Sequence, residues 1–433
     1  MADAPLLVHD EEEDVTKVLS TRPAREGTVA SSILSLVISA CGAGVLSLPF
    51  ALSCTGWAAG SCTLLVFAVA SAWSLELIEM RARDLGTASF EATGAALWGP
   101  RAGLLIELLL FATLAVAQVT FAVLVGDLLP PLCAQLSAPS APPAICATRR
   151  NAIGGALALA SVPSLFTRLH ALRHVSLGAL ACLAFLLAVV CAELARRAAR
   201  GELARAGRPL RPPADWTAWL GAFPIQTAAF SNQFNYTAMM AELQRPTPER
   251  LRVVRLTSVG ACFAVCCAYG LVGYAIFGEG VTGDLLEAFG AARGSLGGAL
   301  RAGRAALAAC LILKVPLLLQ PMRSIAIGWA SRACGDGGCA YVHGCTTAAL
   351  LCGIYCASTL LERVEDVFAI AGALGLMLVC FVVPGSFAFR PPFSSARRAS
   401  TRLRVQGAAL IAFGSVLTAT SVFACISNLA RVQ

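Results

Sequence analysis

Long apolar runs recur along almost the whole chain, and they constrain its fold more than any other feature. Hydrophobic residues make up 57% of the 433 residues and charged residues only 13%, whereas soluble domains carry about 25% charged residues. A helix needs about 20 mainly apolar residues to cross a bilayer. The sequence therefore predicts an all-α integral membrane protein with eleven spans, at residues 29–52, 57–79, 103–129, 150–167, 175–195, 217–241, 256–277, 303–322, 346–361, 365–389 and 405–428.

The beginning of the chain differs from the rest. Residues 1–28 hold seven acidic and three basic side chains and no apolar run, a composition that cannot bury a core. We therefore expect a disordered acidic cytoplasmic tail at 1–28 and one transmembrane domain at 29–433. The tail lacks the basic and apolar regions of a signal peptide. Its "DAPLL" at residues 3–7 resembles an acidic-dileucine sorting signal, but so short a pattern often arises by chance.

The distribution of basic residues predicts the orientation. Most Lys and Arg outside the spans fall on the cytoplasmic side when the N-terminus is cytoplasmic, as the positive-inside rule requires. The arginine-rich connection at 196–211 opposes this assignment. Alternatively, the short run at 150–167, which contains Pro163, does not cross. We expect a multi-pass protein of the plasma membrane or of a vacuolar or lysosomal membrane. The net charge of +8 comes mainly from loop arginines, so no nucleic-acid partner is expected.

Two spans carry polar or flexible residues at their centres. Gly42 and Gly44 interrupt the run 29–52, and residues 231–233, Ser-Asn-Gln, interrupt the run 217–241. Glycine costs about 1 kcal/mol inside a helix, and Ser and Asn compete for backbone hydrogen bonds. Paired interruptions in two halves of a membrane protein are typical of transporters with inverted repeats. The alternative, close packing of helices at small residues, does not account for the amides of the second interruption.

A lysine inside an apolar run is the second unusual feature. Of 33 basic residues only Lys17 and Lys314 are lysines, and Lys314 lies in the middle of the run 303–322. A charge at the bilayer centre costs about 2.5–3.5 kcal/mol and is a functional candidate by default. Lys314 could replace a bound cation or could bind and release a proton. The structural alternative is an ion pair with a buried acid such as Glu107 or Asp127.

Four stretches resemble one known family. "GAGVLSLPFALSCTGW" at 42–57, "AFPIQTAAFSNQFNYTAMMAELQRPTPERL" at 222–251, "KVPLLLQPMR" at 314–323 and "VFAIAGALGLMLVCFVVPGSF" at 367–387 are similar to the first, sixth, eighth and tenth helices of the amino acid/auxin permease family. The resemblance points to its branch of neutral amino acid transporters, which includes sodium-coupled members. It implies a LeuT-like fold, with two inverted five-helix halves, an eleventh helix, and discontinuous helices 1 and 6. It also implies alternating-access transport of neutral amino acids.

The resemblance also implies roles for particular residues. Backbone N–H groups in the first interruption would hold the substrate carboxylate, helped by the positive end of a half-helix. Carbonyls around Phe230, Ser231 and Asn232 would receive the ammonium, and Phe230 and Phe234 would form part of an aromatic gate. The implied substrate-binding residues are Gly42, Ala43, Gly44, Phe230, Ser231, Asn232 and Gln233.

The sequence departs from the sodium-coupled members at two positions. Their asparagine four residues before the first glycine is replaced by Ile38, and their hydroxyl residue before Val315-Pro316 is replaced by Lys314. Both changes remove oxygen atoms that a hard cation such as sodium would use. We therefore expect a sodium-independent carrier, with H⁺ as the candidate coupling ion. The alternatives are a sodium symporter with other ligands and a membrane amino acid sensor.

The remaining candidates concern other chemistry. Cys133 and Cys146 flank an outer loop and could form a disulfide in an oxidising compartment. Four metal-type residues lie in an inner loop, but their spacing matches no common zinc site, so we expect no metal; they are Cys334, Cys339, His343 and Cys345. Gln118 could touch substrate or bond to another helix. Glu76 and Glu79, near two arginines, read as an interface cluster. No catalytic constellation or cofactor motif appears, so we expect neither an enzyme nor a cofactor. We also expect the protein to be a monomer.

Overall fold

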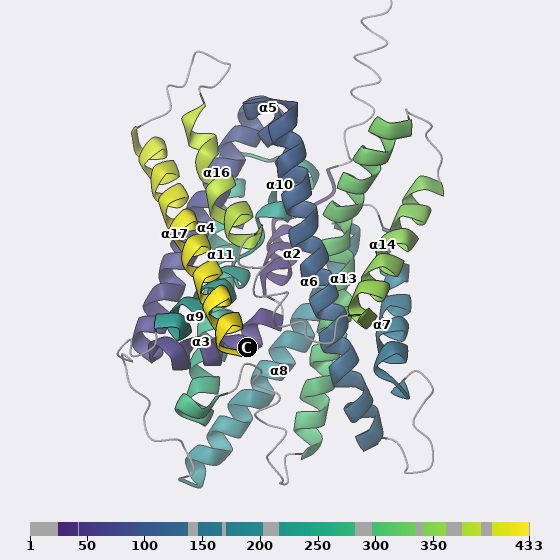
Figure 1. Cartoon of the computed structure of the whole chain (residues 1–433), viewed down its shortest axis with the longest axis vertical. Coiled ribbons are helices and arrows are strands. Elements are labelled where there is room, and N and C mark those ends of the chain that lie inside the picture. Colours follow the sequence, from purple (N-terminus) through teal and green to yellow (C-terminus); the bar gives the residue numbers. More distant parts are fainter. Residues whose placement is uncertain are drawn as a thin grey trace, which may run out of the picture.

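The computed structural model consists of helices over the residues that it describes (Figure 1). Those residues are 25–41, 43–136, 146–166, 170–201, 216–281, 297–334, 341–360, 375–390 and 401–432. The first half contains α2 (Val29–Ala40), η1 (Ala43–Ser47), α3 (Leu48–Thr55), α4 (Trp57–Leu85), α5 (Phe90–Trp98), α6 (Pro100–Leu136), α7 (Arg149–Ser164), η3 (His170–Leu172) and α8 (Arg173–Ala199). The second half contains α9 (Trp216–Ala228), α10 (Gln233–Glu242), α11 (Pro248–Phe277), η4 (Gly278–Gly280), α13 (Gly297–Cys334), α14 (Tyr341–Leu360), η6 (Leu378–Val382), α16 (Val383–Ser386), η7 (Phe387–Phe389) and α17 (Thr401–Val432).

A described helix occurs in each of the eleven predicted spans. Among the described residues, six helices are long and apolar enough to cross a membrane by themselves, namely α4, α6, α8, α11, α13 and α17. The first span qualifies as a pair of helices, Val29–Ala40 and Gly44–Thr55, which are bent by 55° relative to each other. The sixth span is divided into α9 and α10. In the tenth, residues 365–374 lie outside the described part of the chain.

The described part of the chain begins shortly before the first helix of the expected transmembrane domain. Residues 1–24 of the expected tail lie outside the described residues. Thr28 caps α2, because its hydroxyl accepts a hydrogen bond from the Ser31 N–H at 3.1 Å. Gly27 pairs with the chain beyond α10, donating its N–H to the Glu242 carbonyl at 2.9 Å. The chain is thus attached to the helical domain from Gly27 onward.

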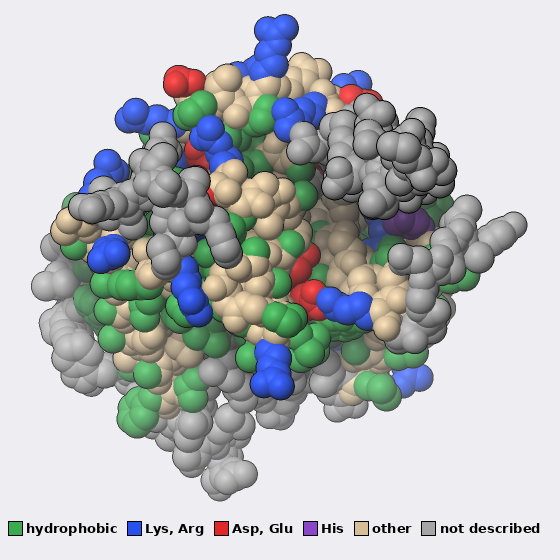
Figure 2. All heavy atoms as spheres, turned by 90° about the horizontal axis from the view of Figure 1, so that it is seen from above, with side chains coloured by type: hydrophobic (Ala, Val, Ile, Leu, Met, Phe, Trp, Pro, Cys, Tyr) green, Lys and Arg blue, Asp and Glu red, His purple; other side chains and the backbone are tan. Residues whose placement is uncertain are grey.

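The face of the molecule at the α5 end is rich in basic side chains. The end of the molecule that holds α5 is the cytoplasmic end in the predicted orientation (Figure 1). Figure 2 views this end and shows many Lys and Arg side chains but fewer Asp and Glu side chains among the described residues. This charge distribution follows the positive-inside rule.

The short fourth span ends on a buried arginine. With 16 residues, α7 is about 24 Å long at 1.5 Å per residue, less than the roughly 30 Å hydrocarbon core. Arg323 of α13 donates to the carbonyls of Ser164 at 2.5 Å and Phe166 at 2.8 Å, and to the Thr347 hydroxyl at 3.2 Å. The guanidinium therefore satisfies carbonyls that the end of a helix leaves without partners.

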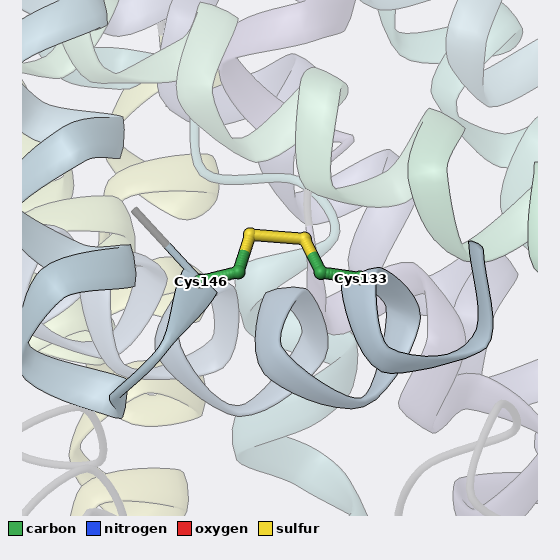
Figure 3. The surroundings of a disulfide bond; sticks show 2 residues. All are labelled: Cys133 and Cys146. Atoms are coloured by element: carbon green, nitrogen blue, oxygen red, sulfur yellow. A yellow bond between two sulfur atoms is a disulfide. The ribbon is translucent and has the colours of Figure 1, made fainter. Parts of the chain in front are cut away.

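A disulfide links the ends of the third and fourth spans. The structure joins Cys133 of α6 to Cys146, three residues before α7, with 6.2 Å between their Cα atoms (Figure 3). The two residues are 13 positions apart in the sequence. The bond therefore closes a short loop and fixes the start of α7 against α6.

We expect Cys133→Ser to lower the free energy of unfolding by about 3 kcal/mol, because without the disulfide no closed loop restricts the unfolded chain. Thermal unfolding of the detergent-solubilised protein would measure the change. Cys62→Ser is the control, since Cys62 is an exposed free thiol on α4. Equal unfolding temperatures for the two variants would contradict a stabilising disulfide.

Candidate functional site

The first span is broken at mid-membrane. Helix α2 ends at Ala40, and the Cys41 N–H donates back to the Val37 carbonyl at 2.7 Å. The chain continues in the 3₁₀ turn η1 from Ala43, while Gly42 lies outside the described residues. A Cβ added to Gly44 would lie 3.6 Å from the Ala228 Cβ, an ordinary contact. Close helix packing therefore does not explain a glycine at position 44.

The second break separates α9 from α10. Residues 231 and 232 are not helical. The Phe230 N–H donates to Thr227 at 3.0 Å, and the Asn232 N–H donates to the Phe230 carbonyl at 3.1 Å. The Ser71 hydroxyl of α4 also donates to this carbonyl, at 3.2 Å. The Phe230 carbonyl, predicted to receive the substrate ammonium, thus already accepts two hydrogen bonds.

The side chains at the second break contain polar atoms without protein partners. Asn232 is 1% exposed, and neither its amide nitrogen nor its amide oxygen has a hydrogen-bond partner among the described residues. Gln233 donates to the Ser71 hydroxyl at 3.2 Å, and its oxygen is likewise unpartnered. Burying an unsatisfied polar group costs about 1–3 kcal/mol. A ligand or an ordered water that supplies the missing hydrogen bond would explain such groups.

The two predicted gate residues are both buried. Phe230 precedes the break and Phe234 is in the first turn of α10. Both pack in the main hydrophobic cluster of the protein. Both rings and the polar atoms of Asn232 thus lie within residues 230–234.

Lys314 joins α13 to the first broken span. Its side chain is 1% exposed, and its Nζ donates to the Ser39 carbonyl of α2 at 3.4 Å. The Nζ also lies 5.3 Å from the centre of the Phe121 ring of α6, within the range of a cation–π contact. Ser39 is near the end of α2, directly before the break. The cation is therefore beside the unwound backbone.

The acids proposed as partners of Lys314 have other partners. Asp127 binds Arg149 at 2.7 Å. Glu107 accepts hydrogen bonds from Trp329, at 2.7 Å, and from Arg332. No described carboxylate forms a salt bridge with Lys314. The ion-pair alternative with Glu107 or Asp127 is therefore wrong.

Ser39 and Asn235 connect Lys314 with the second break, through contacts that the sequence analysis did not predict. Asn235 of α10 donates to the Ser39 hydroxyl at 2.8 Å and to the Leu317 carbonyl of α13 at 3.4 Å. Ser39 thus contacts both Lys314 and Asn235. In the sequence, Ser39 and Asn235 are polar residues inside apolar runs. Neither run indicated which residue of another helix each would contact.

The remaining candidates lie as follows. Ile38 is fully buried on α2 next to Ser39 and places no side-chain oxygen near the cation. Gln118 donates to the Val315 carbonyl at 2.9 Å, so it forms a bond between α6 and α13. Cys339 lies outside the described residues, and no cluster of three or more metal-type side chains occurs within the described ranges.

Two helices broken at mid-membrane, with a buried cation beside one break, define a membrane transporter with discontinuous helices. Residues 25–427 match the family model described as transmembrane amino acid transporter protein. The chain belongs to this family, and it is an amino acid transmembrane transporter rather than an enzyme. The family resemblance seen in the sequence is thereby confirmed.

Two relatives illustrate the match. Vacuolar amino acid transporter 5 of Schizosaccharomyces pombe is 25% identical, over 82% of this chain and 83% of its own length. Solute carrier family 38 member 8 of Homo sapiens is 27% identical, over 62% of each chain. Both alignments thus extend over most of the transmembrane domain.

The fold agrees with solved transporters. MhsT in complex with L-phenylalanine superposes with a TM-score of 0.61 at 13% identity, covering 93% of this chain and all of MhsT. A Na⁺-coupled sialic acid symporter superposes with a TM-score of 0.59 at 11% identity, covering 93% of this chain. These likenesses show the fold alone, and they confirm the LeuT-like multi-span architecture.

Proposed function

We propose that the protein carries neutral amino acids by alternating access without sodium, with Lys314 in the place of a bound cation. The observation that carries the proposal is the hydrogen bond from the Lys314 ammonium to the Ser39 carbonyl, directly before the first break. A backbone carbonyl at the end of a half-helix is a typical ligand of a coupling ion in broken-helix transporters. Here an ammonium group occupies that carbonyl.

The surroundings of Lys314 support the replacement of a bound cation by its ammonium group. Ile38 supplies no side-chain oxygen, and the flat face of Phe121 lies against the Nζ. Hard cations require oxygen ligands, whereas an ammonium is stabilised by one carbonyl and an aromatic face. Lysine, unlike arginine, can lose its proton in a buried site. Proton binding at Lys314 is the coupling reaction that we propose.

The substrate would be held between the two breaks. Backbone N–H groups at the start of the 3₁₀ turn η1, at Ala43 and Gly44, would bind the carboxylate. Carbonyl oxygens and the side-chain oxygen of Asn232 at the second break suit an ammonium, since that oxygen has no other partner within the described residues. Phe230 and Phe234 would cover the site. The charges of a zwitterion would thus be bound by peptide groups and one amide, which favours a neutral amino acid.

The names of the relatives suggest which cellular membrane holds the protein. The fission yeast relative is named as a vacuolar transporter. We propose a vacuolar or lysosomal membrane, with the N-terminal tail in the cytoplasm and the Cys133–Cys146 loop in the lumen. Fluorescence microscopy of a tagged chain against a vacuolar marker would test this location.

Uptake into proteoliposomes under separate gradients tests the coupling. We expect a labelled neutral amino acid to accumulate equally with sodium or potassium outside and to accumulate faster under an inward proton gradient. Competition by the twenty amino acids against that label would identify the preferred substrate. Strict dependence on sodium would refute the proposal.

A further inference from the structure

A buried ionic cluster lies on the cytoplasmic side of the second break. Glu79 of α4 accepts hydrogen bonds at 2.9 Å from the Tyr236 hydroxyl of α10 and at 2.9 Å from Arg255 of α11. All three side chains are buried, and Glu79 is 6% exposed. We call these three residues the inner cluster. The sequence analysis assigned Glu79 to an interface cluster on its own helix, but the structure connects it to two other spans.

The inner cluster is anchored to a wider ion network. Arg83 lies 4.0 Å from Glu79 on the same helix. Glu76 lies 4.0 Å from Arg255 and 3.8 Å from Arg402 of α17. Spans 2, 7 and 11 are thus joined by charges. Helix α10 enters this network through the Tyr236 hydroxyl.

Helix α10 is also attached to α2 near both of its ends. Near its start, Asn235 donates to the Ser39 hydroxyl. At its end, the Glu242 carbonyl accepts a hydrogen bond at 2.9 Å from Gly27, two residues before α2, and the Gln244 N–H donates to the Gly27 carbonyl at 2.8 Å. A displacement of α10 would therefore pull α2 with it.

We propose that the Tyr236–Glu79 hydrogen bond is a latch that holds α10, and through it α2, in the closed position on the cytoplasmic side. Glu79 and Arg255 act as positioning residues through Tyr236. This inference rests on the proposed alternating access. The physical basis is that a hydrogen bond to a buried carboxylate is stronger than one between neutral groups. Arg255 holds the Glu79 carboxylate in place, so α10 can move away only when the Tyr236–Glu79 hydrogen bond breaks.

A native cysteine can report the opening of the latch. Cys41 directly follows α2 and is fully buried, so a water-soluble reagent does not reach it in this structure. If α2 moves with α10, Cys41 becomes reachable from the cytoplasmic side. Cys380 of η6 is equally buried and is joined to neither moving helix by the bonds described above. Its modification would report unfolding.

The test applies a membrane-impermeant maleimide to the cytoplasmic face of sealed vesicles and measures modification of the Cys41 peptide by mass spectrometry. We expect Tyr236→Phe and Glu79→Gln to raise the rate of Cys41 modification roughly tenfold, which corresponds to about 1.4 kcal/mol. Tyr269→Phe is the matched control. Its hydroxyl is also buried but donates to the Leu183 carbonyl of α8 at 2.5 Å, not to Glu79 or to α10.

Each outcome decides the inference. Faster modification of Cys41 in Tyr236→Phe than in Tyr269→Phe, with Cys380 protected, supports the latch, and equal rates overturn it. If Glu79→Gln unfolds and exposes Cys380, Tyr236→Phe alone decides. Modification requires no transport, so the failure of the uptake experiment and the failure of the latch are distinguishable.

Discussion

Lys314→Met is expected to abolish transport, or to remove its dependence on pH, while the protein stays folded. Methionine fills a similar volume but cannot donate to the Ser39 carbonyl or carry a charge beside the broken span. A hydrogen bond from a charged group contributes about 1.5–3 kcal/mol, so the rate of uptake should fall at least about tenfold. Initial uptake rates in proteoliposomes between pH 5 and pH 8 would measure both effects.

Lys314→Arg separates the two roles of the lysine. Arginine keeps the positive charge but does not lose its proton in a protein. If Lys314 is a fixed cation, this variant should retain pH-independent uptake, whereas a proton-coupling site should fail in both variants. Arg332→Met on the same helix is the control, because Arg332 is 56% exposed and pairs with Glu107. Unaltered transport and pH dependence in Lys314→Met would remove the lysine from the mechanism.

Arg323→Ala is expected to destabilise the protein by about 2–6 kcal/mol, because two buried carbonyls lose their donor and each unsatisfied buried polar group costs about 1–3 kcal/mol. The substitution leaves the Ser164 and Phe166 carbonyls without their donor at the end of the short helix α7. The unfolding temperature in detergent and the yield of folded protein should both fall.

The matched control is Arg332→Ala, nine residues nearer the end of α13. Its guanidinium is mainly exposed, and an exposed ion pair contributes about 0–1 kcal/mol. Similar unfolding temperatures for Arg323→Ala and Arg332→Ala would show that Arg323 does not support α7.

Much of the architecture could be predicted from local sequence. Apolar runs of sufficient length must form helices in a membrane, because each backbone group needs a partner within its own segment. The glycines at 42 and 44 and the polar residues at 231–233 predicted breaks for the same reason, and both spans are broken. These inferences need no knowledge of which helices are neighbours.

The contacts of the candidate site could not be predicted in this way. The intramembrane position of Lys314 was evident, but its suggested acidic partners were wrong, because Asp127 and Glu107 bind nearby arginines. Glu79 read as part of a charge cluster on its own helix, whereas Tyr236 and Arg255 contact it from 157 and 176 residues away. Sequence spacing carries no information about contacts over such distances.

By itself the sequence determined that the chain spans a membrane many times, where two spans are interrupted, and that one lysine is buried among apolar residues. Hydropathy and backbone hydrogen bonding are local properties, so local sequence is sufficient for these conclusions. Only the tertiary structure decided that Lys314 contacts the Ser39 carbonyl, that Arg323 caps α7, and that Tyr236 joins α10 to Glu79. These bonds depend on which helix faces lie together, and that arrangement is set by the packing of the whole bundle.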